Sequence, residues 1–120
     1  MKRQELENRL IDFAVMIAKL IQLLPESKFV NHLIGQLIRS GTSPALNYGE
    51  AQSGESRNDF IHKLRIVLKE LRESHVNLRI IQKLNVIQNE PILLLATNEC
   101  NELISIFVKS IDTTLKNKDS

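Results

Sequence analysis

The chain has 120 residues, which is the length of a single domain and leaves little room for a second core. Its 4 glycines and 3 prolines are too few for the many tight turns of a β-sandwich or β-barrel. The net charge of +2 does not by itself indicate a nucleic-acid partner, and the single cysteine, Cys100, excludes an internal disulfide and a multi-cysteine zinc site.

The beginning of the chain has the periodicity of a helix at about residues 4–24. Its apolar side chains recur at alternating intervals of four and three residues, which is a heptad seam. Pro25 ends this segment, because proline disfavours helical geometry in the residue before it. The apolar run at residues 13–18 is too short, and too closely flanked by charge, for a signal peptide or a membrane span. We therefore expect a cytoplasmic protein without a membrane partner, which the lone thiol fits.

A second helix is predicted at residues 28–51, with Ser27 as its N-cap. Pro44 lies inside this segment, where it lacks an N–H and clashes with the carbonyl of Ser40. The helix must therefore kink near Pro44 or restart there. A restart has suitable chemistry, because Ser43 is a good N-cap and proline suits the first helical position.

Two longer helices follow, at about residues 56–84 and 90–115. Ser56 with Asp59 three residues later resembles a capping box, and Pro91 falls in the first turn of the last helix. Both segments carry heptad seams, and the links between all four are short. The sequence therefore predicts an all-α fold, with residues 1–120 forming one up-down-up-down antiparallel four-helix bundle.

No motif indicates catalysis. The Glu-x-x-His pairs that hold a di-iron centre in a bundle core do not occur, and His62 and His75 face different sides of their helix. Two carboxylate pairs lie three residues apart, at Glu70 with Glu73 and at Glu99 with Glu102. Salt bridges or solvated charges explain such pairs better than acid–base chemistry does. We expect no enzyme activity, metal, cofactor or small-molecule substrate.

Positive charge is concentrated in the helix at residues 56–84. At 100° per residue, five of its cations share a sector about 80° wide, opposite the heptad seam. Such a stripe can follow a phosphate backbone, although it is also what the wet face of an amphipathic helix looks like. The basic stripe consists of Arg65, Lys69, Arg72, Arg79 and Lys83.

A second pattern is apolar surface beyond what one buried stripe per helix requires. It indicates either subunit contacts or a wide core face. The interface candidates are Ile11, Val15 and Ala18 in the helix at residues 4–24, and Ile66 and Ile80 in the helix at residues 56–84.

Two stretches resemble a known family. They are QLIRSGTSPALNYGEA at residues 36–51 and SRNDFIHKLRIVLKELRESHVNLRII at residues 56–81, and NELISIFVKSI at residues 101–111 agrees in character. They are similar to bacterial four-helix bundle proteins first noticed as reading frames in intervening sequences of 23S ribosomal RNA genes. The family's polar positions match a set that includes Arg39, Asn47, Glu50, Glu70 and Glu73. Because neighbouring helices run antiparallel, we expect Arg39 to reach a carboxylate of this polar cluster.

The resemblance implies a bundle without enzyme activity that assembles as a homopentamer. Relatives include a basic accessory protein of diversity-generating retroelements, which is thought to bind nucleic acid. The leading hypothesis is therefore a homo-oligomer that binds RNA or DNA non-specifically through the basic stripe. The alternative is a structural or protein–protein adaptor without nucleic-acid affinity, and a small hydrolase or metal enzyme is a third, weaker hypothesis.

Overall fold

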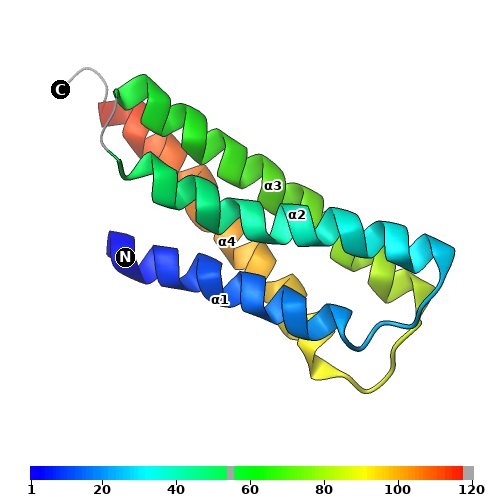
Figure 1. Cartoon of the computed structure of the whole chain (residues 1–120). Coiled ribbons are helices and arrows are strands. Elements are labelled where there is room, and N and C mark those ends of the chain that lie inside the picture. Colours follow the sequence, from blue (N-terminus) through cyan, green and yellow to red (C-terminus); the bar gives the residue numbers. More distant parts are fainter. Residues whose placement is uncertain (54–55, 118–120) are drawn as a thin grey trace.

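The computed structural model describes residues 1–53 and 56–117, and these residues form four helices. The helices are α1 (Arg3–Ile21), α2 (Lys28–Ala51), α3 (Arg57–Leu84) and α4 (Pro91–Lys116). Each helix packs against its neighbour in the sequence, and α1 closes the bundle against α4 (Figure 1). The start of α1 and the end of α4 lie at the same end of the molecule (Figure 1). The predicted all-α up-and-down four-helix bundle is thus confirmed.

Local chemistry explains where the helices begin. The Ser27 hydroxyl accepts a hydrogen bond from the backbone N–H of Val30 at 3.1 Å, which caps α2. At α3, the Ser56 hydroxyl and the Asp59 carboxylate each accept from the other residue's N–H, forming a capping box. Pro91 is the first residue of α4, where its missing N–H has no partner to lose.

The first helix was expected at about residues 4–24, but α1 ends at Ile21, three residues earlier. The N–H groups of Leu23 and Leu24 donate to carbonyls three residues back, those of Leu20 and Ile21, at 2.9 and 3.3 Å. A tightened last turn of this kind satisfies terminal carbonyls before Pro25 redirects the chain.

Pro44 lies inside an unbroken α2, so the restart alternative is wrong. Ser43 is an interior residue, and its hydroxyl accepts a hydrogen bond from the Asn47 side chain at 2.8 Å. Pro44 cannot donate to the Ser40 carbonyl, and Figure 1 shows the axis of α2 bending in its middle.

Heptad residues of all four helices meet in one core. Phe13 of α1 and Phe107 of α4 are fully buried, and the ring of Tyr48 packs edge-on against that of Phe107 with centroids 5.5 Å apart. Gly41 of α2 lets α1 approach closely, because a Cβ atom there would lie 3.0 Å from Cγ1 of Ile17.

Within the described residues, α4 is the one helix long and apolar enough to cross a membrane by length and composition. The same helix contributes Cys100, Leu103 and Phe107 to the core of the bundle.

Candidate functional site

The five cations of the basic stripe are all exposed on α3. They make no ion pair or hydrogen bond with any residue that the structure describes. This holds for Arg72 too, because residues one or two positions away on a helix do not face it. Glu70 and Glu73 instead pair with Arg39 of α2. The stripe from Arg65 to Lys83 runs for about 27 Å along the helix axis.

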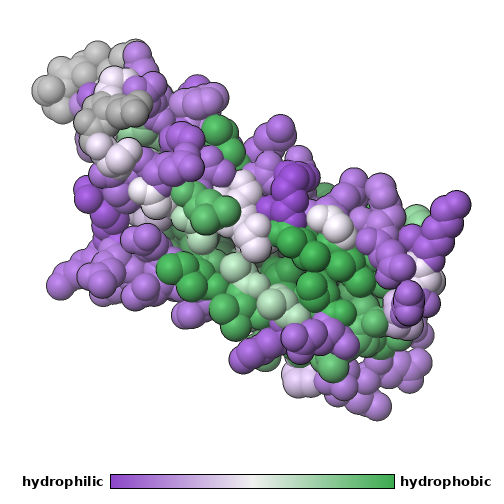
Figure 2. Space-filling view, in the orientation of Figure 1, coloured by the Kyte–Doolittle hydropathy of each residue, from purple (hydrophilic) through white to green (hydrophobic). Residues whose placement is uncertain are grey.

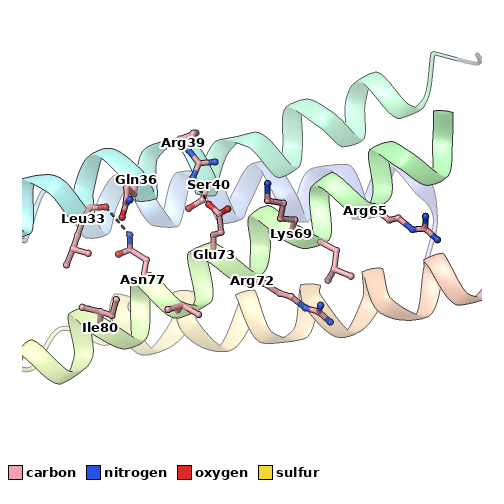
Figure 3. Close-up of a pocket in the computed structure, with 12 residues that line it drawn as sticks. Leu33, Gln36, Arg39, Ser40, Arg65, Lys69, Arg72, Glu73, Asn77 and Ile80 are labelled. Atoms are coloured by element: carbon pink, nitrogen blue, oxygen red, sulfur yellow. Dashed lines mark hydrogen bonds and ion pairs between the residues drawn. The ribbon is translucent and has the colours of Figure 1, made fainter. Parts of the chain in front are cut away.

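Part of the stripe borders a groove between α2 and α3, with a cavity volume of about 840 Å³. Figure 3 shows Arg65, Lys69 and Arg72 toward its cationic end and Ile80 toward its aliphatic end. Val76, one turn before Ile80 on α3, also lines the groove. Val76 is 53% exposed and Ile80 37%, so this end of the groove opens to solvent. The remaining lining residues are Leu33, Gln36, Arg39, Ser40, Leu68, Glu73 and Asn77.

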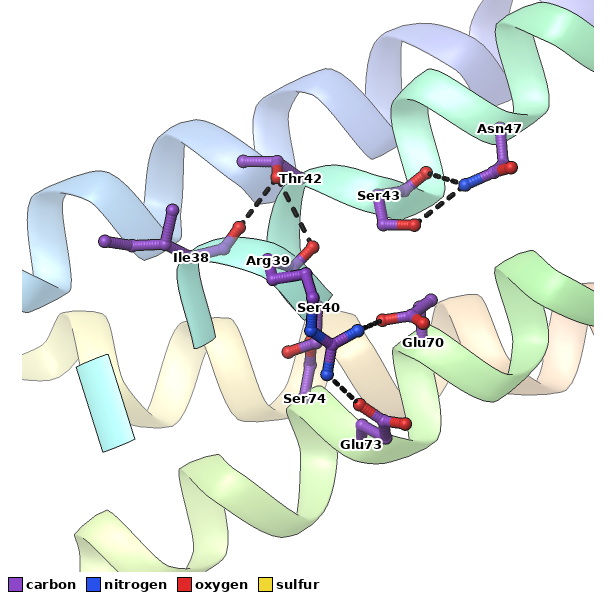
Figure 4. A network of polar contacts seen from close by, with 9 residues as sticks. All are labelled: Ile38, Arg39, Ser40, Thr42, Ser43, Asn47, Glu70, Glu73 and Ser74. Carbon is purple, nitrogen blue, oxygen red and sulfur yellow. Dashed lines mark hydrogen bonds and ion pairs between the residues drawn. The ribbon is translucent and has the colours of Figure 1, made fainter. Parts of the chain in front are cut away.

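Arg39 bridges α2 and α3 in the middle of this groove (Figure 4). Its Nη1 atom donates to Glu70 at 2.5 Å and its Nη2 atom donates to Glu73. The Glu73 hydrogen bond, followed by the charges of Glu70 and Glu73, raises the pKa of Arg39 above its ordinary value. Because Glu70 is buried, the guanidinium supplies the charge partner that a carboxylate in that position requires.

Two buried polar pairs lie beside the Arg39 bridge. The Ser74 hydroxyl donates to the Ser40 hydroxyl at 2.8 Å, and the Asn77 Nδ2 atom donates to the Leu33 carbonyl at 3.0 Å. The carbonyl can only accept, so the Asn77 amide nitrogen must face it and the amide oxygen must point elsewhere. This oxygen is buried and has no hydrogen-bond partner among the described residues, and leaving an acceptor unpaired in this way costs about 1–3 kcal/mol.

Two members of the predicted polar cluster lie away from Arg39. The Asn47 side chain donates to Ser43, one turn earlier on α2, and Glu50 pairs with Lys63 of α3 at 2.5 Å. The structure thus gathers Arg39, Glu70 and Glu73 into one network and places Asn47 and Glu50 in separate contacts.

The interface candidates divide between two surfaces. Ile11 and Val15 are each 46% exposed on α1, and Ala18 is exposed beside them. Figure 2 shows hydrophobic surface extending over α1 and α2, and Ile38 of α2 is also 46% exposed. Ile80 instead lines the groove on α3, and Ile66 is half-buried on the same helix. We call the exposed residues Ile11, Val15, Ala18 and Ile38 the α1–α2 face.

Two further titratable groups, Cys100 and His75, have shifted pKa values. Burial raises the pKa of the Cys100 thiol to about 12, and its sulfur donates to the Leu71 carbonyl at 3.1 Å. Burial, with a smaller contribution from Arg79, lowers the pKa of His75. Among the described residues, no three His, Cys, Asp or Glu side chains are grouped in a way that would hold a metal ion.

Sequence reasoning missed two contacts. The first is the hydrogen bond from Asn77 of α3 to the Leu33 carbonyl of α2. The position of the polar Asn77 directly beside the heptad residue Leu78 could have indicated it. The second is the ion pair between Arg9 of α1 and Glu99 of α4, at 2.5 Å. Spacing within one helix cannot predict a contact between residues so far apart in the sequence.

Comparison with known proteins agrees with this architecture. The family model of the 23S rRNA-intervening sequence protein matches residues 2–113. The chain belongs to that family. Its fold is similar to the crystal structure of a protein of unknown function from the S23 ribosomal protein family of Bacteroides thetaiotaomicron, with a TM-score of 0.78 and 31% sequence identity. The match covers 93% of this chain and 99% of the other. A search of the curated proteins found no match.

Proposed function

We propose that this member of the 23S rRNA-intervening sequence protein family is a non-enzymatic, cytoplasmic homo-oligomer that binds RNA or DNA through the basic stripe. The observation that carries the proposal is the unpaired state of the stripe. Five exposed cations follow one face of α3, and none has an anionic partner among the residues described. Cations arranged in this way release counterions from a phosphate backbone when they bind it.

Assembly would strengthen this binding without new contacts. The α1–α2 face presents aliphatic side chains to water, which is typical of a surface that another subunit covers. A closed ring of subunits repeats the basic stripe around the assembly, so one nucleic acid meets several stripes at once. The resemblance noted from the sequence favours a pentamer.

An electrophoretic mobility shift tests the proposal with single- and double-stranded RNA and DNA at two salt concentrations. Arg65→Glu/Lys69→Glu should weaken binding to every probe and flatten the salt dependence by about one unit for each phosphate that the variant no longer binds. The matched control is Lys28→Glu/Lys109→Glu, which changes the net charge equally at exposed positions outside the stripe.

Two outcomes contradict nucleic-acid binding through the stripe. One is the absence of any shift at low salt, and the other is an equal loss of affinity in the stripe variant and the control variant. Either result would favour the second candidate function, an adaptor that uses the α1–α2 face to contact proteins.

A further inference from the structure

We propose that the groove between α2 and α3 seats an unpaired base of a single-stranded nucleic acid, while the neighbouring phosphates contact Lys69 and Arg72. This inference rests on the proposed function and adds a strand preference to it. It predicts that the protein distinguishes single strands from duplexes without reading a particular sequence.

The first argument is the division of the groove into two chemically different ends. Arg65, Lys69 and Arg72 lie toward one end and Ile80 lies toward the other (Figure 3), and Val76, one turn before Ile80 on α3, also lines the groove. A nucleotide has the same division, with a flat, largely apolar base on one side of the sugar and an anionic phosphate on the other. The rise of a helix places Arg72 about 7.5 Å and Lys69 about 12 Å along the axis from Asn77.

The second argument is Asn77, which lines the aliphatic end of this groove and whose buried Oδ1 atom has no hydrogen-bond partner among the described residues. Asn77 is 6% exposed, and its Nδ2 atom is already committed to the Leu33 carbonyl. Its Oδ1 atom has no donor among the residues that the structure describes, and the exposed side chains of Gln36 and Ile80 lie on either side of Asn77 in the groove (Figure 3). Because this oxygen is buried in the free protein, the side chains of Gln36 and Ile80 must move apart before a base can bring an N–H group to it.

The third argument concerns which nucleic acids can supply that donor. Every common base carries at least one N–H group on its Watson–Crick edge, so the site tolerates different bases. In a duplex that edge is already paired, which leaves only the phosphates available to the protein. Single strands are recognised through unstacked bases in this general way.

The fourth argument favours a polymer over a small phosphate ester. Arg79 and Lys83 continue the basic stripe beyond the residues that line the groove. A mononucleotide would leave these two cations unused. A strand that runs along α3 contacts them with its further phosphates while one base occupies the groove.

The test compares two single-stranded probes of equal length and charge, an oligothymidylate and an oligomer of abasic sites, by fluorescence anisotropy at low salt. The inference predicts that the abasic probe binds about five- to tenfold more weakly, because it has no base to donate the hydrogen bond or to pack against the aliphatic end. A duplex of the same length should resemble the abasic probe once its affinity is expressed per phosphate.

A double substitution locates the base within the groove. Val76→Ala/Ile80→Ala removes the aliphatic end without changing charge, and it should reduce binding of oligothymidylate to the level of the abasic probe. The salt dependence of oligothymidylate binding should be the same in this variant as in the wild type, because no cation is removed. Leu94→Ala/Leu95→Ala is the matched control, because both leucines are exposed on α4 and neither lines the groove.

The outcomes separate the two proposals. Equal affinity for oligothymidylate and the abasic probe would contradict binding of a base in the groove, but it would remain consistent with phosphate binding by the basic stripe. No binding of either probe overturns both. If Val76→Ala/Ile80→Ala lowers the mass of the assembly measured by light scattering, the groove is a subunit contact and binding of a base in it is also contradicted.

Discussion

The charged residue Arg39 and the weakly polar residue Cys100 have different roles in the bundle. Arg39 is exposed, yet it joins α2 to α3 through carboxylates of unequal burial: the Glu70 side chain is 10% exposed and that of Glu73 40%. Cys100 is buried, and its only polar contact among the described residues is the Leu71 carbonyl. The arginine thus holds an interface together, whereas the cysteine fills space in the core.

The Cys100 thiol should be inert in the folded protein. With a pKa of about 12, roughly one molecule in ten thousand carries the reactive thiolate at pH 8. An aromatic disulfide reagent should therefore modify Cys100 only as fast as the protein unfolds, and at once in denaturant. Ser105→Cys adds an exposed thiol on α4 as the positive control. Rapid stoichiometric labelling of the native wild type would contradict a buried thiol.

Individual partners were the hardest feature to predict from the sequence. The heptad and the matched polar positions indicated that Arg39 meets a carboxylate. They did not separate Glu70 and Glu73 from Glu50, which pairs with Lys63 instead. Spacing along α2 alone excludes Glu50, which lies about 16 Å from Arg39 along the helix axis. Which carboxylate of α3 meets Arg39 depends instead on the rotation of α2 about its own axis relative to α3, and a one-helix pattern carries no information about that rotation. The groove and the position of the buried, unpartnered Asn77 oxygen depend on the same relative rotation of α2 and α3.

Whole elements were easier to predict, because each helix carries its own signals. Seam spacing, Ser27, the Ser56–Asp59 box and Pro91 together place three of the four helices within a residue of their observed ends. The exception is the end of α1, where a tightened turn precedes Pro25. Pro44 was harder, since local chemistry allowed a restart, and packing of the buried segment around Ser40 and Gly41 keeps α2 continuous.

Two glycines of α2 should respond oppositely to alanine. At Gly41 a new Cβ would lie 3.0 Å from Cγ1 of the buried Ile17, so Gly41→Ala should lower the free energy of unfolding by about 1–3 kcal/mol. Gly35 has no atom within 4 Å of the corresponding position, so Gly35→Ala should raise it by about 0.5–1 kcal/mol. Urea unfolding followed by circular dichroism measures both. The same sign in both variants would mean that helix propensity, rather than the approach of α1, decides the effect.

At the scale of the whole molecule, the surface is divided by chemistry. The α1–α2 face is aliphatic, and the outward face of α3 is cationic. This separation allows one surface to bury against other subunits while the other stays available to a polyanion. The sequence predicted both patterns and the helices that carry them, but only the fold shows that Ile80 lines the groove between α2 and α3.

A charge placed on the α1–α2 face should weaken assembly. Wild-type protein should scatter light as a multiple of 13.7 kDa, and Val15→Glu should shift that mass toward one chain, because burying the carboxylate is unfavourable. Helicity by circular dichroism should be nearly unchanged, since Val15 is 46% exposed. Leu94→Glu, on α4, is the control that should leave the mass unaltered. A wild-type mass near that of one chain at micromolar concentration would contradict the proposed oligomer.

The buried polar pairs between α2 and α3 have a further consequence for the uniqueness of the fold. Regular heptads alone allow two helices to slip past each other by one turn and still bury aliphatic side chains. Such a slip would separate Ser40 from Ser74 and Leu33 from Asn77, and it would bury their polar atoms unpaired. These pairs therefore fix the axial register of α3 against α2, much as a single buried polar residue fixes the register of a coiled coil.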